Sequence, residues 1–215
     1  MKEKIIKSEW IAHAGFASWL VNHMKPKIVV DLGTNTGCSA IAFAGPNIGT
    51  IHTVDKFDNK QVYMEALDNV SYVKNVVVHK SKFSDLAENW KKSIDILHID
   101  GDHEFESTNE DCRLWIPKVD KNGIVLIHDV WNPRFPDVLA VFYSNVGGYK
   151  LMFPRGLGLG LATSNVKLYT DIYKKWHDHV IVNSVIECLL NYSARMHGWL
   201  NQVLEWSALE KDQLE

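Results

Sequence analysis

Short runs of apolar, largely β-branched residues alternate with longer segments of helical periodicity up to about residue 128. The apolar runs lie at residues 27–32, 50–54, 75–79, 94–99 and 123–128. The helical segments lie at about residues 9–24, 38–44, 59–69, 83–92 and 106–116. Continuous apolar runs are typical of strands buried on both faces of a parallel sheet, and parallel strands need helical crossovers. The pattern therefore predicts an α/β domain with a doubly wound, mostly parallel sheet.

The pattern changes beyond residue 130. Pro133 and Pro136 predict a stiff loop in this region. Two further apolar runs, at residues 149–153 and 157–162, are bounded by glycines and predict a closing hairpin. These two runs bring the predicted sheet to seven strands, of which the last is antiparallel.

The C-terminal part, from about residue 169, contains no proline, and its apolar residues recur at intervals of three and four. The recurring residues are Val182, Val185, Leu189, Tyr192, Met196, Trp199, Val203 and Trp206. This heptad-like spacing predicts a helical extension over residues 169–215 after a domain over residues 1–168. The helix either packs on its own domain or pairs with a second chain, which would make the protein a homo-oligomer.

Composition narrows the class of protein. The 215 residues are 46% hydrophobic and 23% charged, which is typical of globular proteins and argues against a disordered chain. The formal net charge of -3 gives no general attraction to phosphate backbones or anionic membranes, so we expect neither nucleic acid nor a membrane as partner. The charged first residues do not predict an export signal, and the three cysteines lack metal-type spacing. We expect a soluble, cytoplasmic protein without disulfides or zinc.

A glycine-containing loop, DLGTNTG at residues 31–37, follows the first predicted strand. Glycines at this point allow a tight turn and the close approach of a ligand to the backbone. A dinucleotide site would have a G-x-G-x-x-G pattern, whose second glycine is replaced here by Asn35. Together with the acidic Asp31, this argues for a ligand with a cationic or zwitterionic part rather than two phosphates. S-adenosylmethionine fits that description.

With this loop the sequence resembles the class I S-adenosylmethionine-dependent methyltransferases, whose first motif is a strand ending in Asp or Glu followed by G-x-x-x-G or G-x-G-x-G. The second predicted strand ends similarly in an acid, Asp55. The segments ILHIDGDH (96–103) and GIVLIHD (123–129) resemble a narrower branch that methylates sugars and the hydroxyls of natural products. The resemblance covers about residues 8–164 and implies a Rossmann-like fold.

The resemblance also implies the residues that bind the methyl donor. Those expected around its methionine part are Asp31, Gly33, Thr34, Asn35, Gly37 and Ser39. Asp55 would accept hydrogen bonds from the ribose hydroxyls. The adenine would meet Phe57 and residues 81–83, among which Ser81 and Phe83 are the candidates. Asp100, after the fourth predicted strand, is a further donor-binding candidate.

Two acids and two histidines follow the fourth and fifth predicted strands, and they are the candidate catalytic residues Asp100, His103, His128 and Asp129. Methyl transfer requires an acceptor oxygen held at attack distance and the removal of its proton. In one hypothesis Asp100 and Asp129 bind a divalent cation, with Mg²⁺ favoured. In the other, His103 or His128 acts as a general base without a metal. Related metal-dependent methyltransferases have a second acid or amide after the later Asp, where this sequence has Val130.

Trp131 and Arg134 follow Asp129 in the predicted loop and are candidate substrate-binding residues, suited to stacking on a ring and binding an anionic group. We therefore predict O-methylation of a small-molecule hydroxyl, with a sugar or glycosylated metabolite as the favoured acceptor. One alternative is an NAD(P)-dependent oxidoreductase, which the missing second glycine and the lack of a Tyr-x-x-x-Lys pair disfavour. Another is a non-catalytic nucleoside-binding module that assembles through its helical tail.

Overall fold

The computed structural model describes residues 8–182, with the backbone alone for the last two. The chain divides into two compact units, Met1–Val180 and Ile181–Glu215. The domain boundary predicted at residue 168 falls inside a helix of the first unit. Most of the predicted seam, from Val185 to Trp206, lies outside the described residues, so oligomerisation through it stays a prediction.

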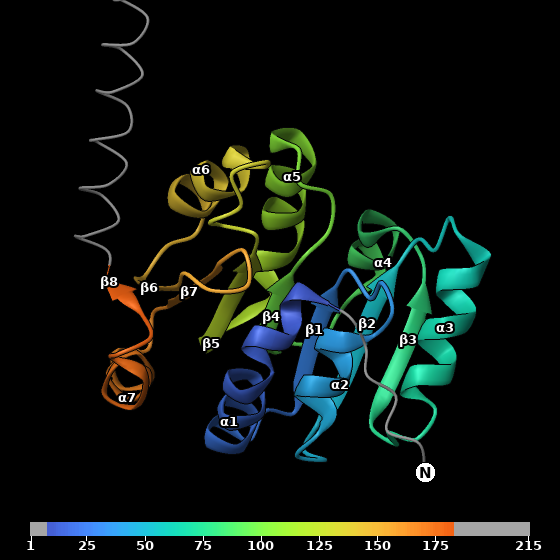
Figure 1. Cartoon of the computed structure of the whole chain (residues 1–215), viewed down its shortest axis with the longest axis horizontal. Coiled ribbons are helices and arrows are strands. Elements are labelled where there is room, and N and C mark those ends of the chain that lie inside the picture. The colour runs from blue at the N-terminus through green and yellow to red at the C-terminus, as the bar shows by residue number, and fades with distance from the viewer. Residues whose placement is uncertain (1–7, 183–215) are drawn as a thin grey trace, which may run out of the picture. The chain divides into compact units, whose positions relative to one another are not determined.

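The first unit contains a seven-stranded sheet in the order β3-β2-β1-β4-β5-β7-β6 (Figure 1). The strands are β1 (Ile28–Leu32), β2 (Thr50–Asp55), β3 (Val76–Lys80), β4 (Ile94–Ile99), β5 (Val119–His128), β6 (Tyr149–Phe153) and β7 (Leu159–Thr163). The five strands from β3 to β5 in this order pair in parallel, whereas β7 is antiparallel to its neighbours β5 and β6. This confirms the predicted doubly wound, mostly parallel sheet with an antiparallel last strand. A two-residue strand, β8 (Ile181–Val182), begins the second unit where the sequence pattern predicts helix.

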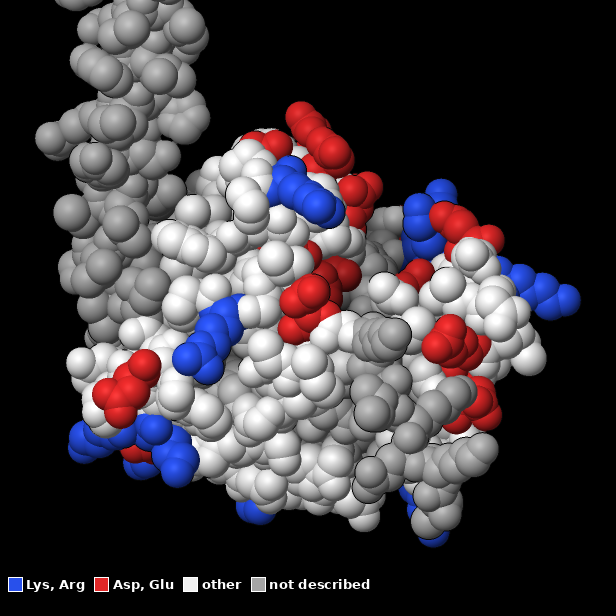
Figure 2. Space-filling model, in the orientation of Figure 1, with Lys and Arg blue, Asp and Glu red and all other residues white. Residues whose placement is uncertain are grey.

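The helices cover both faces of the sheet, with α1, α2 and α3 along one side and α4, α5 and α6 along the other (Figure 1). The helical elements are η1 (Glu9–His13), α1 (Ala14–Met24), α2 (Cys38–Ala44), α3 (Lys60–Val70), α4 (Phe83–Asn89), α5 (Phe105–Trp115), η2 (Ile116–Lys118), α6 (Pro136–Asn145) and α7 (Val166–Trp176). Among the described residues, no helix has both the length and the apolar character that spanning a bilayer requires. Figure 2 shows scattered Lys and Arg side chains on the face in view, with no continuous basic surface there.

Helix α6 is absent from the sequence-based prediction, which is wrong at this point. Pro136 does not extend the loop but occupies the first turn of α6, where its fixed φ suits the helix and its missing N–H costs nothing. Val138, Val141 and Phe142 recur at helical spacing and are buried against the domain. The two prolines within four residues concealed this short amphipathic pattern.

Candidate active site

Three polar side chains form a buried row across the centre of the sheet. Asp31 of β1 is in register with Thr53 of β2 on one side and with His98 of β4 on the other. All three residues are 0% exposed. A carboxylate is costly to bury unless hydrogen bonds replace its water shell, so its partners decide what it can do.

The carboxylate of Asp31 accepts three hydrogen bonds, from His98 Nδ1 (2.7 Å), Thr53 Oγ1 (2.7 Å) and Ser39 Oγ (2.9 Å). The indole Nε1 of Trp10 donates to His98 Nε2 at 2.9 Å. Because an indole nitrogen can only donate, Nδ1 must carry the proton of a neutral His98 and point it at Asp31. The carboxylate therefore links β1 to β2, β4 and α2 in the interior. It is not exposed to solvent.

The glycine loop needs Gly33 because another part of the backbone passes close to it. Gly33 has φ of 104°, and a Cβ built there would lie 1.8 Å from the carbonyl oxygen of Asp100. The close approach is fixed by the Asp100 backbone N–H, which donates to the Leu32 carbonyl at 2.8 Å. The glycine thus lets the end of β4 lie against the end of β1.

We expect Gly33→Ala to lower the free energy of unfolding by about 3 kcal/mol, since it adds both backbone strain and a steric clash. Urea denaturation measures this change. Gly15→Ala is the matched control, because a Cβ at Gly15 in α1 meets nothing within 4 Å. That variant should be as stable as the wild type or slightly more so. Equal stability of the two variants would contradict the clash.

Two cavities lie at the carboxyl ends of the strands, on either side of Gly33, Asn35 and Asp100, which line both. The first, the loop cavity, measures about 260 Å³ and is lined by residues 8–10, 33–36, 38, 39 and 100. The second, the outer cavity, measures about 510 Å³ and is lined by residues 33, 35, 55–59, 62 and 100–103. In open α/β sheets ligands bind at this edge.

Asp55 forms part of the outer cavity and is held rigidly by the backbone. Its Oδ2 accepts the N–H of Asn35 and its Oδ1 accepts the N–H of Phe57, each at 2.9 Å. Each carboxylate oxygen has a second acceptor position, so a pair of ligand hydroxyls can still bind. Phe57 is buried beside it with its ring 4.7 Å from that of Tyr63.

The structure places most predicted donor-binding residues at these cavities, but not all of them. Asp31, Gly37, Ser81 and Phe83 are not among the lining residues. Gly37 instead caps α2, and the Ser81 hydroxyl donates to the Lys82 carbonyl. The Phe83 ring packs over Gly101, where a Cβ would lie 2.6 Å from it. The motif places these residues near the site without fixing their direction.

Several lining residues are missing from the sequence-based prediction. They include Glu9 and Trp10 in the loop cavity and Asn59, Val62, Gly101 and Asp102 in the outer cavity. Their presence depends on how η1 and the loops after β2 and β4 are folded over the sheet. The ILHIDGDH segment could have indicated Gly101 and Asp102, whereas no sequence signal indicates that η1 covers the glycine loop.

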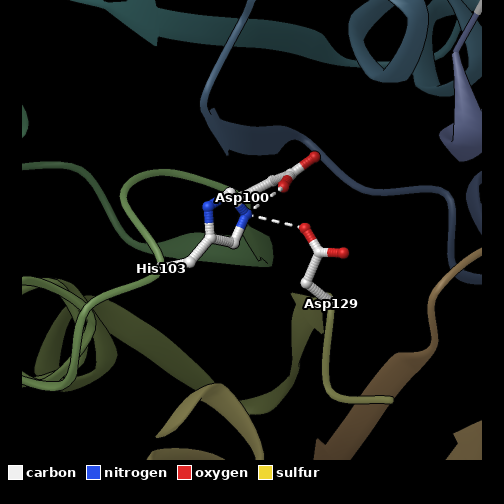
Figure 3. A group of neighbouring side chains, drawn as sticks. All are labelled: Asp100, His103 and Asp129. Atoms are coloured by element: carbon white, nitrogen blue, oxygen red, sulfur yellow. Dashed lines mark ion pairs between the residues drawn. The ribbon is translucent and has the colours of Figure 1, made fainter. Parts of the chain in front are cut away.

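The four predicted catalytic residues do come together, and two of them, Asp100 and His103, line the outer cavity. Nε2 of His103 lies 2.6 Å from Asp129 Oδ2 and 3.7 Å from Asp100 Oδ1 (Figure 3). Nδ1 of His128 lies 3.3 Å and 3.4 Å from the same two oxygens. Asp100 also lines both cavities, so this cluster is continuous with them.

These side chains strongly influence each other's protonation. Contact with Asp100, and then with Asp129, raises the pKa of His103 to about 9. Burial lowers the pKa of His128, but the two carboxylates outweigh it and raise that pKa to about 10. Burial also opposes ionisation of the two acids, yet the imidazoles hold both carboxyl pKa values well below the usual range. The two carboxylates are therefore ionised and favour positive charge between them.

Surrounding residues hold the cluster in place. Asp129 has φ of 61°, and its Oδ1 accepts the Nδ2–H of Asn132 at 2.8 Å. The ring of Phe135 stacks on His103 with 4.3 Å between centroids and 13° between planes. The Nε2 of His128 lies 2.9 Å from the Gly156 carbonyl oxygen. The sequence gives no direct signal for these three supporting residues.

The predicted acceptor-binding residues lie on the loop that follows Asp129. Trp131 is 41% exposed, and its backbone N–H donates to the Leu157 carbonyl at 2.9 Å. Arg134 is exposed, and its backbone N–H donates to Asn132 Oδ1 at 3.1 Å. The loop is thus anchored by its backbone, which leaves both side chains exposed.

The family comparison agrees with this fold and site. Residues 30–130 match the model of a family described as a methyltransferase domain. This range contains the glycine loop, Asp55 and all four residues of the cluster. Residues 30–130 thus match a methyltransferase domain, and this match and the Rossmann-like fold confirm the resemblance to class I S-adenosylmethionine-dependent methyltransferases seen in the sequence.

The sequence identity of this chain to individual proteins is low. The chain is 30% identical over 172 residues to protein y4gI of Sinorhizobium fredii, covering 72% of this chain but only 19% of that protein. A proposed O-methyltransferase from Klebsiella pneumoniae has a similar fold (TM-score 0.60, 16% identity, 77% of this chain and 84% of that one). A Bacillus cereus O-methyltransferase in complex with SAH also has this fold (TM-score 0.57, 16% identity, 75% of this chain and 81% of that one). The Streptomyces achromogenes O-methyltransferase TomG in complex with SAM has it as well (TM-score 0.55, 15% identity, 76% of this chain and 83% of that one).

Proposed function

We propose that this protein transfers the methyl group of S-adenosylmethionine to a hydroxyl group of a small molecule, with a sugar or a glycosylated metabolite as the favoured acceptor. The observation that carries the proposal is the position of Asp100. Its side chain belongs to the acid and histidine cluster, and the residue also lines both cavities. An acceptor bound at the cluster would therefore lie beside a donor bound in the cavities, as direct transfer requires.

In this proposal the donor lies across both cavities. The loop cavity takes the methionine part, and its exposed acid Glu9, together with Asp100, offers negative charge to the α-ammonium group. Asp55 accepts the ribose hydroxyls while its carboxylate stays fixed by two backbone N–H groups. Phe57 is the aromatic residue at the adenine end.

The acceptor hydroxyl would lie at the cluster, where its proton is removed. Either the carboxylates of Asp100 and Asp129 hold a divalent cation beside it, or one of the two imidazoles takes the proton in its neutral form, which the raised pKa values of about 9 and about 10 make the minor form at neutral pH. Trp131 and Arg134 follow Asp129 in the chain, and their exposed side chains suit a ring that carries an anionic group. TomG, which shares the fold, takes part in tomaymycin synthesis, and this supports a small-molecule acceptor.

Asp55→Asn should weaken S-adenosylmethionine binding by about ten- to 100-fold, because a carboxylate that accepts two ribose hydroxyls is worth about 1.5–3 kcal/mol. Isothermal titration calorimetry measures this loss. Glu65→Gln on the exposed surface of α3 is the control and should bind like the wild type. A wild-type protein that binds NAD but not S-adenosylmethionine would overturn the proposed function. A methyl-release assay over sugars and glycosylated phenols then tests the acceptor class.

A further inference from the structure

We propose that His13 is a positioning residue for the proposed methyl transfer and that it acts through His128. This role rests on the proposed function, because His128 belongs to the cluster at which the acceptor hydroxyl would lie. His13 lies in η1, lines neither cavity and is not one of the four residues of the cluster. Its contacts nevertheless lead directly to the His128 ring.

A single carbonyl oxygen joins the two imidazoles. The Gly156 oxygen lies 2.9 Å from His128 Nε2 and 3.3 Å from His13 Nε2. A backbone carbonyl has two lone pairs and can only accept, so both Nε2 atoms carry a hydrogen and donate it to this oxygen. The two rings also pack edge to face, with 5.4 Å between their centroids and 80° between their planes. His13 therefore contacts His128 both directly and through the shared carbonyl.

These contacts fix which nitrogen of His128 faces the carboxylates. With Nε2 directed at Gly156, Nδ1 lies 3.4 Å from Asp100 Oδ1 and 3.3 Å from Asp129 Oδ2. His13 is 2% exposed and His128 is 5% exposed, so water does not easily replace either donor. Without the His13 ring beside it, the His128 ring would gain room to turn about χ2, the broad terminal torsion of histidine. A turned ring would direct a carbon atom at the two carboxylates.

The backbone at Gly156 allows this close approach of η1. Gly156 has φ of 55°, and a Cβ built there would lie 2.8 Å from the Glu9 carbonyl oxygen and 2.9 Å from His13 Nε2. The next residue, Leu157, also has a positive φ, 65°, which is unfavourable for a bulky side chain. Such conformations persist where the surrounding structure fixes them, and they are frequent at functional sites. The turn is thus held against η1 with its carbonyl between the two imidazoles.

Other contacts of η1 anchor it independently of His13. Trp10 donates its indole N–H to His98 at 2.9 Å, and its ring packs against Phe43. Glu9 and Trp10 also line the loop cavity. Replacing His13 should therefore leave this wall of the loop cavity in place. A change at the cluster can then be distinguished from damage to the donor site.

His13 supplies a hydrogen bond without supplying charge. Burial, and then the neighbouring His128, lower the pKa of His13 to about 4, so its ring is neutral at pH 7. A neutral imidazole has a single N–H, which the Gly156 carbonyl accepts. Glutamine is the conservative replacement, because its amide N–H can take the place of Nε2–H. Phenylalanine keeps an aromatic ring but has no donor.

Steady-state methyl transfer to sugars and glycosylated phenols by the full chain, together with calorimetry, tests this role. His13→Phe should lower kcat by about ten-fold or more, because a misplaced group at the reacting centre is costly, while the affinity for S-adenosylmethionine stays within about two-fold of the wild type. His13→Gln keeps the donor and should keep kcat within about three-fold. The control is His177→Phe, at an exposed histidine that follows α7, and it should change neither quantity.

A double variant tests whether His13 acts through His128. If it does, adding His13→Phe to His128→Gln should lower kcat by no more than about two-fold beyond His128→Gln alone. Independent contributions would instead multiply. Circular dichroism shows which variants fold. If His128→Gln does not fold, the comparison of His13→Phe with His13→Gln decides the question, and His13→Leu replaces His13→Phe if that variant does not fold.

The positioning role is overturned if His13→Phe keeps the wild-type kcat, if His13→Gln loses as much activity as His13→Phe, or if the effects of His13→Phe and His128→Gln multiply. A loss of affinity for S-adenosylmethionine equal to the loss of kcat would also overturn it, because it would indicate a structural role. A wild type that binds no S-adenosylmethionine or methylates no hydroxyl acceptor overturns the proposed function and this role with it. An active wild type with an unaffected His13→Phe variant overturns the role of His13 alone.

Discussion

Asp129→Asn is expected to lower kcat for methyl transfer by at least about 100-fold while the affinity for S-adenosylmethionine stays within about two-fold of the wild type. Asp129 contacts both imidazoles of the cluster but does not line either cavity. Removing its negative charge therefore slows deprotonation of the acceptor in both hypotheses. It weakens cation binding in one and stabilisation of the imidazole in the other. The donor site keeps its own contacts.

Asparagine is the appropriate replacement because it isolates the charge. It tolerates the positive φ of 61° at this position, and its side-chain oxygen can still accept the Asn132 hydrogen bond. The control is Asp137→Asn, at an exposed acid in the first turn of α6, which should keep its kcat within about two-fold. Steady-state rates at saturating S-adenosylmethionine measure kcat, and calorimetry measures the affinity for S-adenosylmethionine. Unchanged turnover in Asp129→Asn would rule out a catalytic role for this carboxylate.

Asp31→Asn is expected to lower the free energy of unfolding by about 3 kcal/mol or more, because it damages a fully buried network. The carboxylate accepts three hydrogen bonds, whereas the Asn amide has only one accepting oxygen. The NH₂ group of the Asn would face N–H or O–H groups that also donate. Urea denaturation measures the loss. The affinity of the folded protein for S-adenosylmethionine should change little, since Asp31 does not line either cavity.

Asp55→Asn is the matched comparison, because this acid also lies near the end of a strand but is partly exposed. It should cost less than about 1 kcal/mol of stability and instead reduce donor affinity. The two variants thus separate a structural acid from a binding acid. If Asp31→Asn were stable but failed to bind S-adenosylmethionine, Asp31 would be a donor ligand, as the motif resemblance implies.

The alternation of strands and helices was predictable because it is a local property. Each strand is a short apolar run, and each crossover has an amphipathic period that can be read within about ten residues. Helix α6 was not predictable by the same approach, since Pro136 interrupts the pattern although it fits the first turn of a helix. The extent of β5 was also underestimated, because the strand begins at Val119, before the apolar run.

The candidate site was predictable in its composition but not in its contacts. Parallel strands bring their carboxyl ends to one edge of the sheet, so Asp55, Asp100 and Asp129 could be assigned to one site from their positions alone. The orientation of Asp31 could not be assigned, because it depends on His98, which lies 67 residues away, and on the contact between His98 and Trp10, which lies 88 residues before His98. Sequence spacing carries no information on such contacts.

By itself, the sequence determined the alternation of strands and helices up to β5, the glycine loop and the set of acids and histidines at one edge of the sheet. Only the tertiary structure decided that Asp31 is part of the interior while Asp55 faces a cavity, and that His103 and His128 direct nitrogen atoms at the same two carboxylates. The physical reason is that periodicity and turn chemistry act between near neighbours. The direction of a side chain is set by strand register and by the packing of distant segments, and it is known only once the chain has folded.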